Sequence, residues 1–236
     1  MLFYYIRHGD PVYDPDGLTP LGQRQAEAVA KRLALHGIDK IYASTSNRAI
    51  LTATPTAEIL KKDIELLDFA NENYAWRELT FPIPDGQSWL FSVPEVKDIF
   101  LSEEMANMGY KWYLHPKLKI KDYKAGIDRI QNGSDTLFES LGYKHLGLGK
   151  YEVTEPKYEK VALFAHQGFG ICFLSCLLGI PFPLFTTHFD LSHSSVTVID
   201  FNNENGYAYP KVLTLSNDSH IYKEGLPTKY NNEKYI

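Results

Sequence analysis

A three-layer α/β/α fold with a mainly parallel central sheet is the structure that this 236-residue sequence predicts. Its first 70 residues alternate strand-like and helix-like stretches in the order β-α-β-α-β, which is typical of a parallel sheet covered by helices. The first stretch, LFYYI at residues 2–6, is apolar at every position, as expected for a strand covered on both faces. The pattern weakens after residue 71 and returns near residue 159, which indicates an insertion.

The helix expected over residues 20–36 has Thr19 as its N-cap, proline in its first turn and glycine after its end. Residues 38–44 and 64–69 are predicted strands. Between them, residues 47–62 are predicted to form a helix that bends or restarts near Pro55, since proline lacks an amide hydrogen.

The chain is predicted to be one domain over residues 1–236, with a core at about 1–71 and 159–222 and an insertion or cap at about 72–158. Helical periodicity in the insertion is clearest near residues 122–143. The core returns with a strand at 160–166, a helix at 168–180 and strands at 195–201 and 208–216. The tail from Lys223 is expected to be a surface extension.

Composition excludes several classes of function. The net charge is −5 and no basic stripe is present, which argues against nucleic-acid binding. No apolar run of membrane-spanning length and no secretory signal pattern occurs, so neither a membrane nor secretion is expected. Cys172 and Cys176 lie four residues apart in an apolar helix, where they favour a role in the core over a disulfide or a metal pair. A cytoplasmic protein is predicted.

Two predicted strands end in histidine, at His8 and at His166, and a third is followed by Arg48. The carboxyl ends of strands in an open α/β sheet meet at one edge, where ligands bind. Arg7 adds a second guanidinium, and arginine matches phosphate oxygens in a bidentate fashion. Each residue alone is more often an ordinary polar side chain, but together they predict a phosphate site.

The segments IRHGD, LTPLGQRQAEAVAKRL, IYASTSNRAILTATPTAEIL and FAHQG resemble the histidine phosphatase superfamily, also called the phosphoglycerate mutase-like superfamily. The resemblance covers residues 2–62 well and 160–200 more loosely. It implies a phosphoglycerate mutase-like fold in which the insertion lies over the active site.

The resemblance also implies roles. His8 would be the nucleophile that forms a phosphohistidine, with Arg7, Arg48 and His166 as the phosphate pocket. Nearby guanidinium charges would keep His8 neutral, and a backbone carbonyl would orient its second ring nitrogen.

Members of the superfamily take a general acid from the start of the insertion, where Glu72 and Glu78 compete. Glu72 is preferred because it follows the strand at 64–69 more closely, whereas Glu78 could be a surface charge paired with Arg77.

Smaller contributions are expected from the Gln167 amide and from Ser194 or Ser195, although serine at a strand start is more often a turn former. His188 and His193 lie near the same edge without an assigned role.

Two departures from the family pattern favour a phosphatase over a mutase. Asp14 stands where many relatives carry asparagine, so it points away from the phosphate or holds another partner. The insertion also lacks an adjacent arginine pair.

The predicted function is a metal-independent phosphatase that hydrolyses phosphate monoesters and needs no cofactor. A cofactor-dependent phosphoglycerate mutase is the alternative, and a non-catalytic phosphate-binding module ranks third because no candidate residue is lost. The expected partner is a small phosphorylated metabolite of open identity. Aromatic residues of the insertion could stack on a substrate but more often form a core. A homodimer is compatible with the sequence, which places no interface.

Overall fold

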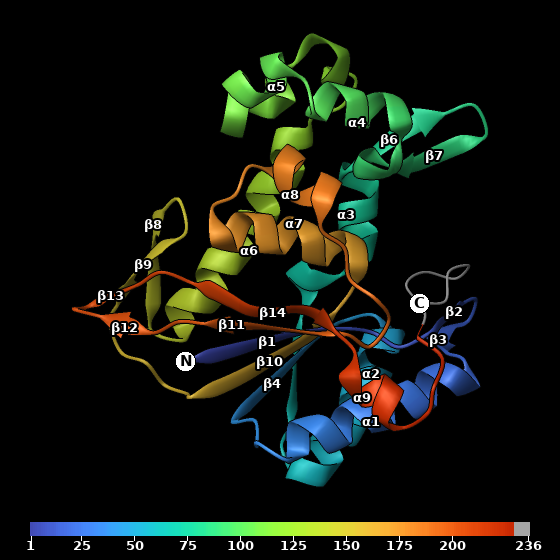
Figure 1. Ribbon diagram of the computed structural model, residues 1–236, viewed down its shortest axis with the longest axis vertical. Coiled ribbons are helices and arrows are strands. Elements are labelled where there is room, and N and C mark those ends of the chain that lie inside the picture. Colours follow the sequence, from blue (N-terminus) through green and yellow to red (C-terminus); the bar gives the residue numbers. More distant parts are fainter. Residues whose placement is uncertain (229–236) are drawn as a thin grey trace.

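The computed structural model describes residues 1–228, and the end of the predicted tail, residues 229–236, lies outside the described residues. A six-stranded sheet in the order β14-β11-β1-β10-β4-β5 forms the centre (Figure 1). Its strands are β1 (Leu2–Arg7), β4 (Lys40–Ser44), β5 (Ile64–Leu67), β10 (Lys160–Ala165), β11 (Val196–Asp200) and β14 (Lys211–Asn217). Helices cover both faces, so the predicted three-layer α/β/α fold is confirmed.

The sheet is mainly parallel, because β1, β10, β4 and β5 pair in parallel and only β11 runs against its neighbours. The register of β1 and β10 pairs Arg7 with Ala165. The residues that follow, His8 and His166, therefore leave the sheet side by side at its carboxyl edge, as the sequence predicts.

Alternation along β1 builds two cores, one on each face of the sheet. Tyr4 and Ile6 are buried with Val29 of α1 (Pro20–Ala34) and Ala53 of α2 (Asn47–Leu60). On the opposite face, Phe3 and Tyr5 pack into the larger aromatic core beneath α6 (Tyr123–Ser140) and α7 (Gln167–Leu178). Figure 1 shows α1, α2 and α9 (Ser219–Lys223) below the sheet, with α6, α7 and α8 (Phe182–His188) above it.

The predicted insertion contains short helices, a hairpin and one long helix. Its helices are α3 (Glu72–Glu78), α4 (Pro94–Phe100), α5 (Glu103–Met108) and α6, with 3₁₀ turns η2 (Leu90–Ser92), η3 (Gly109–Leu114) and η4 (Pro116–Leu118); η1 (Asp68–Ala70) precedes α3. Its strands are β6 (Thr80–Ile83), β7 (Gly86–Trp89), β8 (Tyr143–Gly147) and β9 (Lys150–Val153). Figure 1 shows α4, α5 and the β6–β7 hairpin at the far end from α1.

The second half of the insertion is integrated with the core. The Phe138 ring of α6 lies 5.1 Å from Phe3 of β1, and β9 pairs with β13 (Tyr207–Ala208), which follows the core strand β11. A second sheet in the order β12-β13-β9-β8 results, with β12 at Asn203–Glu204. The predicted boundary between insertion and core near residue 158 stays a prediction, because the second half of the insertion packs directly against the core.

The predicted restart of the helix near Pro55 was wrong, and the predicted core position of the two cysteines is confirmed. A single helix, α2, runs through Pro55 with no restart, because Ala53, Thr56 and Ala57 on both sides of the proline are buried against the sheet. Cys172 and Cys176 are free and buried in α7, as expected for core residues. No helix in the described part of the chain is both long and apolar enough to cross a membrane.

Candidate active site

His8 follows the last residue of β1 and is almost fully buried. Its amide donates to the Ala165 carbonyl at 2.9 Å, and its carbonyl accepts from the Ser194 amide at 3.0 Å. The ring nitrogen Nδ1 lies 2.7 Å from the carbonyl oxygen of Gly9. A carbonyl can only accept, so Nδ1 carries the hydrogen and Nε2 keeps its lone pair. Gly9 thus supplies the orienting carbonyl that the sequence could not identify.

The His8 ring is held in its neutral form. Burial lowers its pKa well below the ordinary value, and the charges of His166, Arg7 and Arg48 lower it further. The guanidinium charges were expected to keep His8 neutral, but loss of solvent is the larger cause. The result is a nucleophilic nitrogen that remains unprotonated at neutral pH.

Arg7, the last residue of β1, is buried and aimed by two fixed acceptors. Its NH1 donates to the Leu191 carbonyl at 2.5 Å, and its NH2 lies 2.6 Å from Nε2 of His193. The guanidinium is always protonated, so it donates and Nε2 of His193 accepts. The segment before β11 therefore orients the guanidinium.

Arg48 is placed by the first turn of α2 and is also buried. Its NH1 contacts the carboxylate of Asp16 at 2.7 Å, and its NH2 contacts Glu72 at 3.1 Å. The ring of Tyr13 lies 5.5 Å from the guanidinium carbon. Arg48 therefore links the phosphate site to a hairpin formed by β2 (Pro11–Tyr13) and β3 (Asp16–Leu18) and to the start of the insertion.

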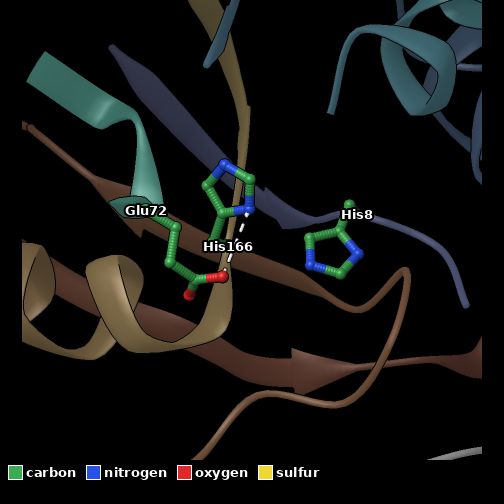
Figure 2. A group of neighbouring side chains, drawn as sticks. All are labelled: His8, Glu72 and His166. Atoms are coloured by element: carbon green, nitrogen blue, oxygen red, sulfur yellow. Dashed lines mark ion pairs between the residues drawn. The ribbon is translucent and has the colours of Figure 1, made fainter. Parts of the chain in front are cut away.

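His166 and Glu72 complete the cluster (Figure 2). Nδ1 of His166 lies 3.6 Å from Oε2 of Glu72, and its Nε2 lies 2.8 Å from the Ser44 hydroxyl at the end of β4. The other carboxylate oxygen of Glu72 accepts from the Gly168 amide in the first turn of α7 at 2.8 Å. Burial, followed by the charges of Arg48 and Arg7, lowers the pKa of His166 well below its ordinary value.

The two candidate acids have different surroundings. Glu72, at the first position of α3, joins the group around His8. Glu78, at the last position of the same helix, accepts two bonds from Nε of Arg129 at 2.8 and 2.9 Å and one from its NH2 at 2.7 Å. Its partner is thus Arg129 of α6 rather than Arg77, and it anchors α3 to α6. The geometry favours Glu72 as the general acid.

The glycines near the two histidines, Gly9 and Gly168, allow neighbouring elements to pack closely. A Cβ on Gly9 would lie 2.6 Å from the carbonyl oxygen of Gly22 in α1, and a Cβ on Gly168 would lie 2.3 Å from the Trp89 ring. The Gly9 amide donates to the Thr52 hydroxyl at 3.0 Å, and the Gly168 amide serves Glu72. Both glycine amides thus bind protein groups.

Ser194 differs from its expected role, whereas the contact expected from the Gln167 backbone amide stays a prediction. The Gln167 side chain donates to Asp190 at 2.5 Å, while its amide stands at the first position of α7. The Ser194 hydroxyl donates to the Gln25 carbonyl at 3.1 Å and lies 3.4 Å from His220. This hydroxyl is engaged with α1 and α9, so the structure does not present it as a phosphate ligand.

The sequence left the role of His193 open and did not indicate Asp10 or Asp16. The His193 ring is buried, lies 5.8 Å from the His8 ring and has Nδ1 3.6 Å from Asp10. No spacing rule distinguishes it from His188, which is exposed at the end of α8. Asp16 contacts Arg48, while Asp14 is exposed in the hairpin turn between β2 and β3.

A cavity of about 510 Å³ opens beside the cluster. It is lined by Tyr13, Asp16, Arg48, Glu72, Asn73, Trp76 and Trp89. Arg48 and Glu72 belong to both the cavity and the cluster. The cluster therefore borders a space large enough for a small metabolite.

The same cluster contains the donor set of a potential metal site. One ring nitrogen each of His8 and His166 and a carboxylate oxygen of Glu72 lie within 4.8 Å of one another. Two imidazoles and a carboxylate are common ligands of transition metals. The same three groups could instead act as a nucleophile, a phosphate ligand and a proton donor. Measuring activity in the presence of a chelator distinguishes a metal site from a metal-independent site.

Comparison with known proteins agrees with the resemblance seen in the sequence. The sequence pattern of the histidine phosphatase superfamily (branch 1) matches residues 3–85, which include Arg7, His8, Arg48 and Glu72. The first third of this chain is thus similar to that superfamily. The predicted assignment as a phosphoric monoester hydrolase of this superfamily is supported by its relatives.

Relatives of known structure share the whole fold. A phosphoserine phosphatase from Entamoeba histolytica, bound to 3-phosphoglyceric acid, matches with a TM-score of 0.59 and 19% identity over 93% of this chain and 98% of its own. The alpha-ribazole phosphatase of Shigella flexneri matches with a TM-score of 0.59 and 18% identity over 92% and 97%. A protein of Hydrogenobacter thermophilus with a provisional name as a phosphoserine phosphatase is 22% identical over 211 residues, covering 85% of this chain and 90% of the relative.

Proposed function

We propose that the protein is a metal-independent phosphatase that hydrolyses phosphate monoesters through a phosphohistidine on His8. The observation that carries this proposal is the hydrogen bond from Nδ1 of His8 to the Gly9 carbonyl, which fixes the tautomer with the lone pair on Nε2. The match of residues 3–85 to the histidine phosphatase superfamily and the phosphatase names of the relatives add support.

Binding would place the phosphoryl group among Arg7, Arg48 and His166. Two guanidinium groups match the oxygens of a dianion, and their burial strengthens the attraction because solvent screens it less. Leu191 and His193 fix one guanidinium, and Asp16 and Glu72 fix the other. Little reorganisation is then needed when charge spreads over the equatorial oxygens in the transition state.

Phosphoryl transfer would occur in two balanced steps. In the first, a bond forms between Nε2 of His8 and phosphorus, the bond to the leaving oxygen breaks, and Glu72 gives that oxygen a proton. In the second, a water oxygen bonds to phosphorus, the N–P bond breaks, and Glu72 takes a proton from the water. His8 is regenerated neutral, and inorganic phosphate leaves.

The test is hydrolysis of p-nitrophenyl phosphate with excess chelator, by wild type, His8→Ala and the control His36→Ala. His36 is exposed in the turn after α1, and its carbonyl accepts from Lys160 at the start of β10, the end opposite to His166. We expect activity to survive chelation in wild type and control and to vanish in His8→Ala. Activity that is equal in His8→Ala, or that chelation abolishes, would overturn the proposal. An inactive wild type that shows mutase activity with added 2,3-bisphosphoglycerate would support the mutase instead.

The expected partner is a small phosphorylated metabolite, and a cytoplasmic location is part of the proposal. Both cysteines are free, and burial raises the pKa of the Cys172 thiol well above its ordinary value. Such thiols suit a reducing compartment but do not require one.

A further inference from the structure

The cavity beside the catalytic cluster has a wall and a charge pattern that restrict what it can hold. Resting on the function proposed above, we propose that this cavity binds the leaving group and selects an uncharged alcohol that carries a ring. Aromatic heterocycles present a flat π face and sugar rings present an apolar face of C–H groups, and both faces can pack on an aromatic side chain.

The position of the cavity assigns it to the leaving group. Glu72 lines the cavity and also stands within the His8 and His166 cluster. A group that receives a proton from Glu72 must approach from the side on which its carboxylate is accessible. The alcohol part of the substrate therefore extends into the 510 Å³ space, which accommodates a group the size of a nucleoside.

Two tryptophans form one wall. Trp76 of α3 and Trp89 at the end of β7 meet edge to face, with ring centroids 5.0 Å apart at 84°. Trp89 is also stacked on Phe91 at 5.5 Å and 13°. Its ring leaves no room for a Cβ on Gly168, at the start of α7. The wall is therefore fixed before a ligand arrives, and stacking on it loses little conformational freedom.

The charges of the cavity oppose an anionic leaving group. Asp16 contributes a carboxylate, Glu72 contributes a carboxyl group that is neutral while it holds the proton it donates, and Arg48 is the single cation among the described residues that line the space. Both ends of the Arg48 guanidinium already contact these two side chains. Once Arg48 binds the phosphoryl group, a second anion such as a carboxylate would find no positive partner and would be repelled.

Polar groups in the cavity suit a neutral alcohol. The carboxylate of Asp16 has more acceptor sites than its contacts with Arg48 and with the Asn47 amide occupy. Asn73 is exposed at the opening and offers both a donor and an acceptor. Ring hydroxyls or ring nitrogens would be satisfied here, so the specificity rests on stacking and on neutral hydrogen bonds.

The experiment compares alkyl phosphates whose leaving groups differ in ring and charge: benzyl phosphate, glycerol 1-phosphate and 3-phosphoglycerate. Adenosine 5′-monophosphate and glucose 6-phosphate separate an aromatic ring from a sugar ring. We expect kcat/KM for benzyl phosphate to exceed that for glycerol 1-phosphate by roughly 10-fold or more, the usual size of a stacking contribution. For 3-phosphoglycerate we expect kcat/KM to be lower still.

Variants identify the residues responsible. Trp76→Leu should lower kcat/KM for benzyl phosphate far more than kcat/KM for glycerol 1-phosphate, so that the two become similar, whereas Tyr222→Leu on the exposed surface of α9 should change neither. Asn73→Arg should raise kcat/KM for 3-phosphoglycerate by supplying a cation. The inhibition constants of the wild type for benzylphosphonate and for 3-phosphonopropionate give the same comparison without any substitution.

The outcomes separate this inference from the proposed function. His8-dependent turnover with 3-phosphoglycerate equal to or better than benzyl phosphate would overturn the inference and leave the phosphatase standing. A preference for benzyl phosphate that survives in Trp76→Leu would also overturn it. Absence of any His8-dependent turnover would overturn the proposed function and the inference with it. Preference for the ring-bearing esters, lost in Trp76→Leu, would support both.

Discussion

The two ends of the active site are built differently. At the phosphate end, Arg7, His8, Arg48 and His166 are all at most 7% exposed, and each is held by a partner in or beside the central sheet. At the leaving-group end, Tyr13 is 59% exposed, Asn73 is exposed and both tryptophans are half-buried. Those residues come from the β2–β3 hairpin and from the insertion.

This contrast separates chemistry from specificity. The phosphate end needs fixed charges and a neutral nucleophile, which the ends of buried parallel strands provide. The leaving-group end must vary with the substrate, which surface hairpins and insertions allow. Substitutions at the buried end should therefore change turnover by large factors, and those at the open end should change the choice of substrate.

The largest effect is expected from the carboxylate at the junction of the two ends. Glu72→Gln keeps the size of the side chain and removes its proton, so kcat with an alkyl phosphate should fall by roughly 10²- to 10⁴-fold. The fall should be smaller with p-nitrophenyl phosphate, whose leaving group needs little protonation. Glu78→Gln is the matched control, because Glu78 pairs with Arg129, and it should keep near-wild-type kcat. Equal losses in the two variants would contradict the assignment of the acid.

Buried histidines at the phosphate end should make the fold sensitive to acid. The pKa values of His8 and His166 are lowered well below normal, mainly by burial, and burial also lowers that of His220 to about 4. Below pH 6.5 the unfolded chain takes up protons on these rings and the folded chain does not, so stability falls as pH falls. Three such groups remove about 3 kcal/mol between pH 6.5 and 5.5.

Urea denaturation in phosphate-free buffer across this range measures the effect. The variant His220→Gln should show a shallower decline, because one of the three groups is gone. Asp190 acts in the opposite direction, since burial raises its pKa, but it is a single group. Constant or rising stability in acid would contradict this account of the phosphate end.

A smaller effect is expected at His193, which positions Arg7. His193→Leu removes the acceptor for the guanidinium and should raise KM and lower kcat by about 10-fold together, the size expected from losing one hydrogen bond to a charged group. His193→Gln offers an amide oxygen and should restore part of the loss. A structural role alone would lower stability equally in both variants and leave kcat of the folded protein unchanged.

The smallest effect is expected at the open end. Asn73→Ala should leave kcat/KM for p-nitrophenyl phosphate within about twofold of wild type, because surface truncations away from the reacting groups cost little. A large loss with this small substrate would break the distinction between the two ends.

The sequence was informative where local patterns coincide with the chemistry. The alternation of strand-like and helix-like segments and the helix caps predicted the sheet, because these signals are local. The two histidines at strand ends predicted that Arg7, His8, Arg48 and His166 lie together, because this follows from parallel pairing. Glu72 was preferred over Glu78 by its distance from a strand end, and the structure places it in the cluster.

The remaining parts of the site depend on long-range packing. His193 reaches Arg7 from 186 residues away, and Asp16 reaches Arg48 from 32 residues away. No periodicity reports such contacts. The sequence also did not show why glycine is needed at positions 9 and 168. The groups that leave no room for a side chain there, Gly22 and Trp89, come from other elements. The continuous helix through Pro55 shows tertiary packing overriding a local helix-breaking preference.

The central claim is a covalent phosphohistidine on His8, and trapping it is the most direct test. Wild type is mixed rapidly with a ³²P-labelled phosphate monoester in the presence of chelator and quenched in alkali, in which phosphohistidine survives and phosphoserine does not. Peptide mapping then locates the label. We predict transient labelling, up to one phosphoryl group per chain, at His8 and none in His8→Ala. Substrate consumption without any label on the protein, or label on another residue, would contradict the account.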